Sequence, residues 1–339
     1  GRYLDVAEQA GFARDLCPYH TAMLGCIDAP ERDAYVERLF TPPDLIIGSN
    51  MPCESESKSF LYAVQKYNVP HYFLDAPLDL GGFEPSQRVV DYYAAGLHGL
   101  LSFLGEHGLK GDEGKLSEVV ARSRAMARLW ADIDELRKLR PTPMRLADAV
   151  IAMYLPIYCA GHPDGLAALQ TIHAEVEQRA AGGPGMGDDE RFRLLLLGIP
   201  PYYNLGLLSY PEAKGGVFVK GEVEYVMTGQ SDVNMLDPER PLQSLARKVI
   251  TDLPAPTYAV RLEVLRRTIR EFHIDGIVAA RKRGCRNFPA GFRLVKDMAA
   301  GEFGVPTTVF DLDGLDLREY NDVQAKSNLD AFVEALASR

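Results

Sequence analysis

Residues 275–313 read DGIVAARKRGCRNFPAGFRLVKDMAAGEFGVPTTVFDLD and decide the fold. An apolar run, Ile277–Ala280, leads into a polar turn with Cys285, and then into apolar residues at helical spacing and a β-branched run, Pro306–Phe310. This pattern predicts a strand, a loop, a helix and a second strand, and two strands joined in this way are parallel. Cys285 falls just past the carboxyl end of the first strand, where doubly wound sheets place their ligands.

A similar unit occurs near the start of the chain, where residues 44–76 read DLIIGSNMPCESESKSFLYAVQKYNVPHYFLDA. Cys53 lies nine positions after Asp44, and Cys285 lies ten positions after Asp275. In both units the helix is followed by Val-Pro and by a strand that ends in Asp. An ordered repeat of this length predicts two similar lobes, each with a cysteine at a strand end beside a shared cleft.

The expected fold class is therefore α/β, with two doubly wound parallel-sheet lobes related by an internal repeat and a helical region between them. At 339 residues the chain is too long for one small core. We expect residues 1–84 to form the first lobe with N-terminal helices, residues 85–186 a mainly helical region and linker, and residues 187–339 the second lobe. The Gly-rich stretch GGPGMGDDE, residues 182–190, is the predicted linker. Local patterns also predict a helix over residues 3–16, a buried helix over residues 147–160 that breaks at Pro156, and a strand over residues 217–225.

The composition excludes several classes of partner. A net charge of −10 argues against nucleic acid and anionic membrane, because both need a basic surface. No apolar run approaches the ~20 residues of a membrane span. The start of the chain lacks the apolar core of a signal peptide, so we expect a cytoplasmic protein. The chain does not begin with Met, and we expect a leading segment before residue 1.

The five cysteines are an odd number with wide spacings, which does not indicate a secreted disulfide framework. They are buried thiols, nucleophiles or metal ligands. We expect Cys159, which lies in an apolar run, to be structural. Cys26 has no neighbouring residues that indicate a function. Cys17, Cys53 and Cys285 each sit at an element boundary beside polar residues, and three dispersed cysteines suit a [4Fe–4S] cluster between lobes. Helix N-termini after the last two would direct N–H groups at an anionic cluster.

Other chemistry has little support in the sequence. No GxGxxG follows a strand and no Walker motif is present, so no phosphate loop is predicted. A cysteine hydrolase needs a paired histidine, and we interpret His20 as a solvated loop residue. Zinc usually needs closely spaced ligands, which these cysteines do not provide.

Several stretches in order resemble one known family. They are DLCPYHTAMLG (15–25), PDLIIGSNMPCESESKSF (43–60), VPHYFLDAP (69–77), RPTPM (140–144), LLLLGIPPYYN (194–204), GCRNFPAGFRLVKDM (284–298) and FDLDGLDLREYNDVQAKSNLDAFVEAL (310–336). Together they resemble the iron–sulfur subunits of 2-hydroxyacyl-CoA dehydratases and benzoyl-CoA reductases, and most of all the reductase B-type and dehydratase α-type branch.

The resemblance implies that Cys17, Cys53 and Cys285 bind a [4Fe–4S] cluster and that an acyl-CoA is the substrate. It implies a heterodimer with a related iron–sulfur subunit and a separate ATP-hydrolysing iron–sulfur reductase (the activator) that delivers a low-potential electron. Dehydratases, which are lyases, use this electron to form a ketyl radical anion and expel the leaving group. The reductases, which are oxidoreductases, use it to dearomatise benzoyl-CoA. Both belong to anaerobic metabolism.

The resemblance gives possible roles to residues around these cysteines. Glu54, Ser55 and Glu56 follow Cys53 and could act as catalytic proton donors or as acids at a helix N-terminus. A basic cluster surrounds Cys285 and could bind CoA phosphates or form a solvated turn; it contains Arg281, Lys282, Arg283 and Arg286. Tyr202 and Tyr203 could stack on an acyl or adenine group or pack in the core.

Two other functions remain open at this point. The charged loops around the cysteines also suit a non-catalytic or electron-relay partner subunit of such a complex. A two-lobed protein that binds a small molecule without a cluster is the third hypothesis.

Overall fold

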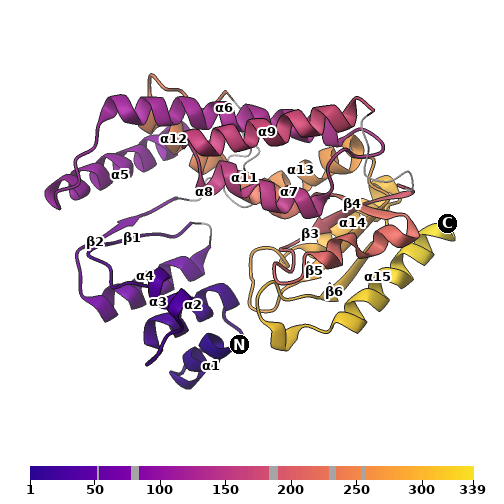
Figure 1. Cartoon of the computed structure of the whole chain (residues 1–339), viewed down its shortest axis with the longest axis horizontal. Helices are drawn as coiled ribbons and strands as arrows, with labels where there is room; N and C mark the ends of the chain where they lie inside the picture. Colours follow the sequence, from indigo (N-terminus) through magenta and orange to yellow (C-terminus); the bar gives the residue numbers. More distant parts are fainter. Residues whose placement is uncertain (52, 78–83, 183–189, 229–233, 253–256) are drawn as a thin grey trace.

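The computed structural model describes residues 1–51, 53–77, 84–182, 190–228, 234–252 and 257–339. The chain forms helices and two parallel sheets (Figure 1), which confirms the expected α/β class. Most of the predicted Gly-rich linker lies outside the described residues. None of the described helices combines the length and the apolar character needed to cross a membrane.

The strands are β1 (Ile46–Ser49), β2 (His71–Leu74), β3 (Phe192–Leu197), β4 (Gly216–Gly221), β5 (Gly276–Arg281) and β6 (Thr307–Asp311). The α-helices are α1 (Arg2–Gln9), α2 (Pro18–Asp28), α3 (Ala34–Leu39), α4 (Glu54–Tyr67), α5 (Gln87–Glu106), α6 (Glu113–Arg137), α7 (Leu146–Ala152), α8 (Tyr154–Tyr158), α9 (Pro163–Ala180), α10 (Gly206–Ser209), α11 (Glu222–Thr228), α12 (Pro241–Thr251), α13 (Tyr258–Glu271), α14 (Phe292–Phe303) and α15 (Asp322–Ala337). Two short 3₁₀ helices are η1 (Tyr210–Lys214) and η2 (Leu317–Glu319).

Each cysteine unit found in the sequence contains a parallel strand pair. In the first sheet β1 pairs with β2, with Ile46 opposite His71, and α4 connects the two strands. The second sheet has the order β4-β3-β5-β6 and all its pairs are parallel, with Ile277 of β5 opposite Thr307 of β6. The described first sheet thus has two strands and the second has four.

The second sheet is covered on both faces, as continuous apolar strands require. Leu195 and Ile277 face a core shared with α13 and α14. Leu194 and Val278 face the opposite core, which includes side chains from α6, α7 and α15. Successive strand residues point to opposite faces, so one apolar run supplies both layers.

Long helices pack beside both sheets. Helices α6 and α9 run side by side along the top of Figure 1, and Trp130 of α6 packs into the core of the second sheet. Helix α12 packs against α5, where Ala246 and Ile250 join Val90 and Leu74 of β2 in a third core. Helices from distant parts of the chain therefore support the first sheet.

Three local expectations from the sequence are wrong. We expected a helix over residues 3–16, but α1 ends at Gln9, and Gly11 follows with a φ of 96°. We expected a strand through VFVKGEVEY, residues 217–225, but β4 ends at Gly221 and α11 begins there. The apolar stretch at 147–160 breaks at Met153 instead of at its proline.

Candidate functional site

The three cysteines selected from the sequence sit at element ends. Cys17 is the N-cap of α2 and Cys53 is the N-cap of α4. Cys285 lies in the loop between β5 and α14, and α14 begins only at Phe292. Contrary to our expectation, no helix N-terminus directly follows Cys285. All three are free and partly exposed, whereas Cys26 is buried. The remaining cysteine, Cys159, is also partly exposed, although its apolar run predicted a core position.

Cys53 lies beside a histidine from the N-terminal helices. Its Sγ is 3.8 Å from Nε2 of His20, whose Nδ1 is 2.9 Å from the Ser59 hydroxyl. Oε2 of Glu56 lies 3.6 Å from the same Nε2. Only 16% of the His20 side chain is exposed, so our interpretation of it as a solvated loop residue is wrong. It comes three positions after Cys17, which places both near the start of α2.

Burial dominates the electrostatics of this group. It raises the pKa of the Cys53 thiol, and the backbone N–H groups of Ser55 and Glu56 partly offset that effect. The Cys17 thiol raises the same pKa further. Burial also raises the pKa of Glu56. It lowers the pKa of His20, and the positive charge of Lys282 adds to this effect.

Lys282 connects the loop of the second unit to Cys17. Its Nζ lies 3.6 Å from the Cys17 Sγ and 3.9 Å from the centroid of the Tyr19 ring. The side chain is buried, with 2% of the residue exposed. One cation from the end of β5 therefore contacts two residues at the start of α2.

The loop that contains Cys285 also packs on the segment before Cys17. Gly284 has a φ of 75°, and a Cβ placed on it would lie 2.4 Å from the carbonyl oxygen of Leu16. Glycine allows both this backbone conformation and the close approach of the two chain segments. The N-terminal segment thus lies between the loops that contain Cys53 and Cys285.

Ion pairs connect the N-terminal segment to the turn that follows β6, the last strand of the second sheet. Arg318 donates to Asp5 at 2.5 Å and to Glu8 at 2.6 Å. Glu319 pairs with Arg14 of the N-terminal segment at 3.0 Å and with Arg283 at 3.2 Å. The position of Cys17 therefore depends on contacts with the turn after β6.

A buried ion pair includes an arginine that also donates hydrogen bonds to the loop between Cys285 and α14. Arg261 of α13 donates to the carboxylate of Glu222, and both side chains are 6% exposed. The same guanidinium donates to the carbonyls of Phe288 at 2.8 Å and Ala290 at 2.6 Å. One arginine thereby joins α11, α13 and the segment between Cys285 and α14.

The two tyrosines predicted to contact substrate, Tyr202 and Tyr203, both pack against other parts of the chain. The Tyr203 hydroxyl donates to the Asp313 carbonyl at 2.7 Å, and the rings of Tyr202 and Tyr154 are 5.9 Å apart. Burial raises the pKa of Tyr19, Tyr202 and Tyr203, so all three stay protonated at neutral pH. The Oδ2 atom of Asp313 is buried without a hydrogen-bond partner among the described residues.

The predicted substrate-binding arginines are exposed. Arg281 makes a two-pronged contact with Asp311, at 2.6 and 3.1 Å, and Arg283 pairs with Glu319. Arg286 is also exposed. Of the three predicted catalytic residues, Ser55 and Glu56 lie beside Cys53, and the Glu54 side chain is outside the described part of the structure.

The donor chemistry fits an anionic cluster. The three thiols are free, two of them are helix N-caps, and a buried ammonium group lies 3.6 Å from the Cys17 Sγ. N–H groups and cations stabilise negative charge. Within the described residues, however, no three His, Cys, Asp or Glu side chains are arranged to hold one metal ion.

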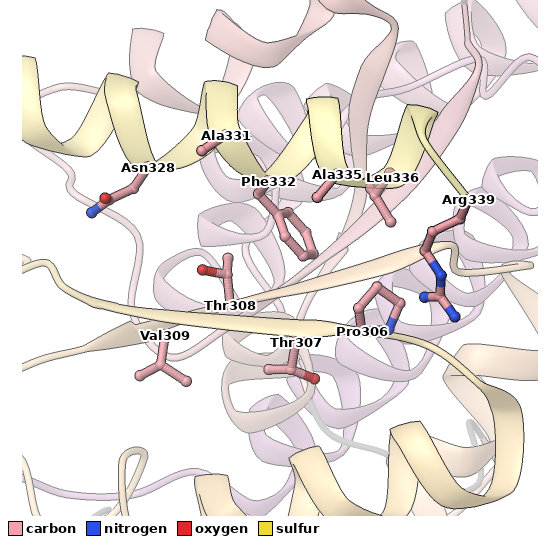
Figure 2. Close-up of a pocket in the computed structure, with 10 residues that line it drawn as sticks. All are labelled: Pro306, Thr307, Thr308, Val309, Asn328, Ala331, Phe332, Ala335, Leu336 and Arg339. Atoms are coloured by element: carbon pink, nitrogen blue, oxygen red, sulfur yellow. The ribbon is translucent and has the colours of Figure 1, made fainter.

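A pocket of about 420 Å³ lies elsewhere, between β6 and α15. Figure 2 shows Phe332 and Leu336 of α15 on one side and Thr308 of β6 facing them, whereas the Thr307 and Val309 side chains project from the other face of the strand. None of the predicted site residues lines it. We therefore do not assign it to the cysteine site.

Sequence reasoning missed the roles of His20, Lys282 and Tyr19. The position of His20, on the helix that Cys17 begins, was an available signal. The sequence identified Lys282 as one residue of a basic run. It did not show that the Lys282 side chain is buried, because this depends on where β5 ends. The contact with Tyr19 joins residues too far apart for any local pattern to reveal.

Comparison with known proteins gives long matches at low identity. The family model described as 2-hydroxyglutaryl-CoA dehydratase, D-component, matches residues 1–336, a range that contains all five cysteines. The chain is 25% identical over 340 residues to the (R)-2-hydroxyisocaproyl-CoA dehydratase alpha subunit of Clostridioides difficile, covering 99% of this chain and 81% of that one. It is 24% identical over 345 residues to the B subunit of benzoyl-CoA reductase from Thauera aromatica, covering 97% and 78%. It is 22% identical over 305 residues to the alpha subunit of (R)-2-hydroxyglutaryl-CoA dehydratase from Acidaminococcus fermentans, covering 89% and 62%.

Proposed function

The chain belongs to the 2-hydroxyglutaryl-CoA dehydratase D-component family, and from this membership we propose that it is a subunit of an enzyme that dehydrates or reduces a CoA thioester. The resemblance inferred from the sequence is thereby confirmed. The match over residues 1–336 is the observation that supports the proposal most strongly. The relatives' names include both dehydratases and a reductase, so the proposal covers both reactions.

The proposal includes a [4Fe–4S] cluster bound by Cys17, Cys53 and Cys285. The packing of α2, which Cys17 caps, on α4, which Cys53 caps, and the close approach of Gly284 to Leu16 support this ligand set. When bound, a cluster with three thiolate ligands supplies a low-potential electron and an iron with an open position for a substrate oxygen. In the proposal this electron comes from a separate ATP-hydrolysing reductase.

Side chains of this chain would supply the proton that the departing hydroxyl group needs. Burial raises the pKa of Glu56, so its Oε2 can hold a proton at a higher pH than an exposed carboxyl can. We assign to it the protonation of the departing hydroxyl group. His20, 3.6 Å away, would keep the carboxyl in place. Glu54 and Ser55 remain in the proposal as further proton donors at the same helix end.

The basic residues near Cys285 would bind the substrate. Arg281, Arg283 and Arg286 are exposed and can contact CoA phosphates, which would replace Asp311 and Glu319 as partners of the first two. Tyr202 and Tyr203 would line the acyl group. The assignments of the three arginines rest on their exposure and on the position of the loop.

We also propose that the two cysteine units are counterparts, one in each lobe. Each cysteine lies four positions after its strand, since 53 − 49 = 4 and 285 − 281 = 4. Both strands pair in parallel with the strand that follows the next helix. The division into residues 1–84, 85–186 and 187–339 stays a prediction.

The relatives are named as alpha or B subunits, so we propose a related iron–sulfur subunit as the partner. Purification from native cells without oxygen should recover a second chain of similar size. The function is tested by the conversion of CoA thioesters with and without the ATP-driven electron donor. Turnover should require the donor, and equal rates in both assays would contradict the proposal.

A further inference from the structure

We propose that Lys282 is a positioning residue that holds Cys17 in place and puts a positive charge beside the cluster, which raises the cluster's reduction potential. This inference rests on the proposed function. It assigns a role to a residue that the predicted ligands and substrate contacts do not include.

Lys282 differs from the cations on either side of it. Arg281 pairs with Asp311 and Arg283 pairs with Glu319, and both arginines are exposed. Lys282 is 2% exposed and forms no ion pair with any carboxylate in the part of the chain that the structure describes. The middle cation of the run is therefore the one directed into the protein.

A buried ammonium group without a counter-ion is unfavourable, because its lost hydration must be replaced. The contacts of Lys282 replace it only in part. The Tyr19 ring, 3.9 Å from Nζ, presents its electron-rich face, which attracts a cation. The Cys17 Sγ, 3.6 Å away, becomes a full negative counter-charge when it ligates iron as a thiolate. The surroundings of Lys282 thus suit an anionic site better than an empty one.

Two secondary-structure elements fix the positions of Lys282 and of the residues that it contacts. Lys282 directly follows β5, whose last residue is Arg281, so its backbone is fixed by the sheet. Tyr19 is the second residue of α2, the helix that Cys17 caps. The lysine and the cysteine are therefore positioned by two separate elements that meet at this contact.

A cation beside a cluster ligand favours the reduced state, which has one more negative charge than the oxidised state. The electron is the one supplied by the proposed ATP-driven donor, and Lys282 itself neither gains nor loses a bond. Removal of the charge should shift the midpoint potential to more negative values. A neutral side chain of similar length tests charge, and arginine tests whether another cation can replace it.

The experiment compares wild type, Lys282→Met, Lys282→Arg and Lys296→Met as full chains purified without oxygen. Lys296 is an exposed lysine of α14, so its variant is the matched control. Iron and labile sulfide are measured per chain, and the midpoint potential is measured by a redox titration followed by electron paramagnetic resonance. We expect a negative shift in Lys282→Met, and values near wild type in Lys282→Arg and in the control.

An unchanged potential in Lys282→Met, or an equal shift in Lys282→Arg, would overturn the inference while leaving the proposed function in place. If Lys282→Met binds no iron, retention of iron in Lys282→Arg supports the role of the charge, and loss in both overturns it. Wild-type protein without iron would overturn the proposed function and this inference together.

Discussion

The guanidinium group of Arg318 donates to the Asp5 carboxylate at 2.5 Å, although 313 positions separate the two residues. The same side chain contacts Glu8 at 2.6 Å and Asp316 at 2.8 Å. This arginine anchors the first helix of the chain to the turn after β6. The segment that leads to Cys17 is therefore held by charge as well as by packing.

Replacement of Arg318 by Met should release α1. Exposed ion pairs contribute about 1 kcal/mol or less each, and the variant loses the pairs with both Asp5 and Glu8. We expect faster amide exchange in α1 and a lower free energy of unfolding. Arg293→Met, which removes an exposed pair with Asp297, is the control and should cost at most about 0.5 kcal/mol. Unchanged exchange in α1 of the Arg318 variant would contradict the anchoring role.

The same anchor predicts a pH dependence. Hydrogen bonds from Arg318 hold the pKa of Asp316 below its usual range. A carboxyl with a depressed folded pKa stabilises the protein fully above its unfolded pKa, about 3.9, and this stability is lost as the pH falls through the folded value. Urea unfolding should therefore show wild type losing stability below about pH 4 more steeply than Arg318→Met. Equal slopes in the two proteins would argue against the pair.

Gly284→Ala should disturb the Cys285 loop. The new Cβ would lie 2.4 Å from the Leu16 carbonyl oxygen and would sit on a backbone with a φ of 75°. Gly304→Ala is the matched control, because its φ is 67° but nothing lies within 4 Å of the new Cβ. The control should lose about 1–2 kcal/mol of stability from backbone strain alone. Gly284→Ala should lose more stability and also lower the iron content; equal losses in both variants would show that the close approach is unimportant.

Arg261→Met should destabilise the protein strongly. It leaves the Glu222 carboxylate buried without its partner and frees two loop carbonyls, at Phe288 and Ala290. Breaking a buried ion pair in this way costs about 3–5 kcal/mol. The control is Arg266→Met, which removes an exposed two-pronged contact with Glu302 and should cost about 1 kcal/mol or less. Chemical denaturation of both variants measures the difference, and similar losses would contradict the structural role of Arg261.

The sequence alone predicted the elements whose signals are local. Apolar runs and turn residues located β1, β5 and β6 and the helices α4 and α14, because each pattern lies within a few turns of chain. The segment after Gly221, the second part of the stretch 217–225, was predicted as strand. It instead forms α11, whose acids Glu222 and Glu224 pair with the buried Arg261 and Arg137. Such pairs join distant segments, and no local pattern contains them.

In the candidate site too, the sequence predicted the features with local patterns but not the contacts between distant segments. The predicted metal ligands were selected by their place at strand and helix ends, and the structure places Cys17 and Cys53 at the N-caps of α2 and α4, two helices that pack together. The contacts of His20 and Lys282 with these cysteines span 33 and 265 positions. They depend on how α2 packs against α4 and against the residue that follows β5, which composition and periodicity do not determine.

Iron and labile sulfide per chain, measured for the five Cys→Ser variants prepared without oxygen, test the central claim most directly. Serine oxygen is a poorer ligand than thiolate for iron in a sulfide cluster, so variants of Cys17, Cys53 and Cys285 should lose iron and turnover. Variants of Cys26 and Cys159 should keep iron near the wild-type level, with a packing loss of about 1–3 kcal/mol at the buried Cys26. Loss of the cluster from either of these two, with retention in one of the first three, would contradict the account.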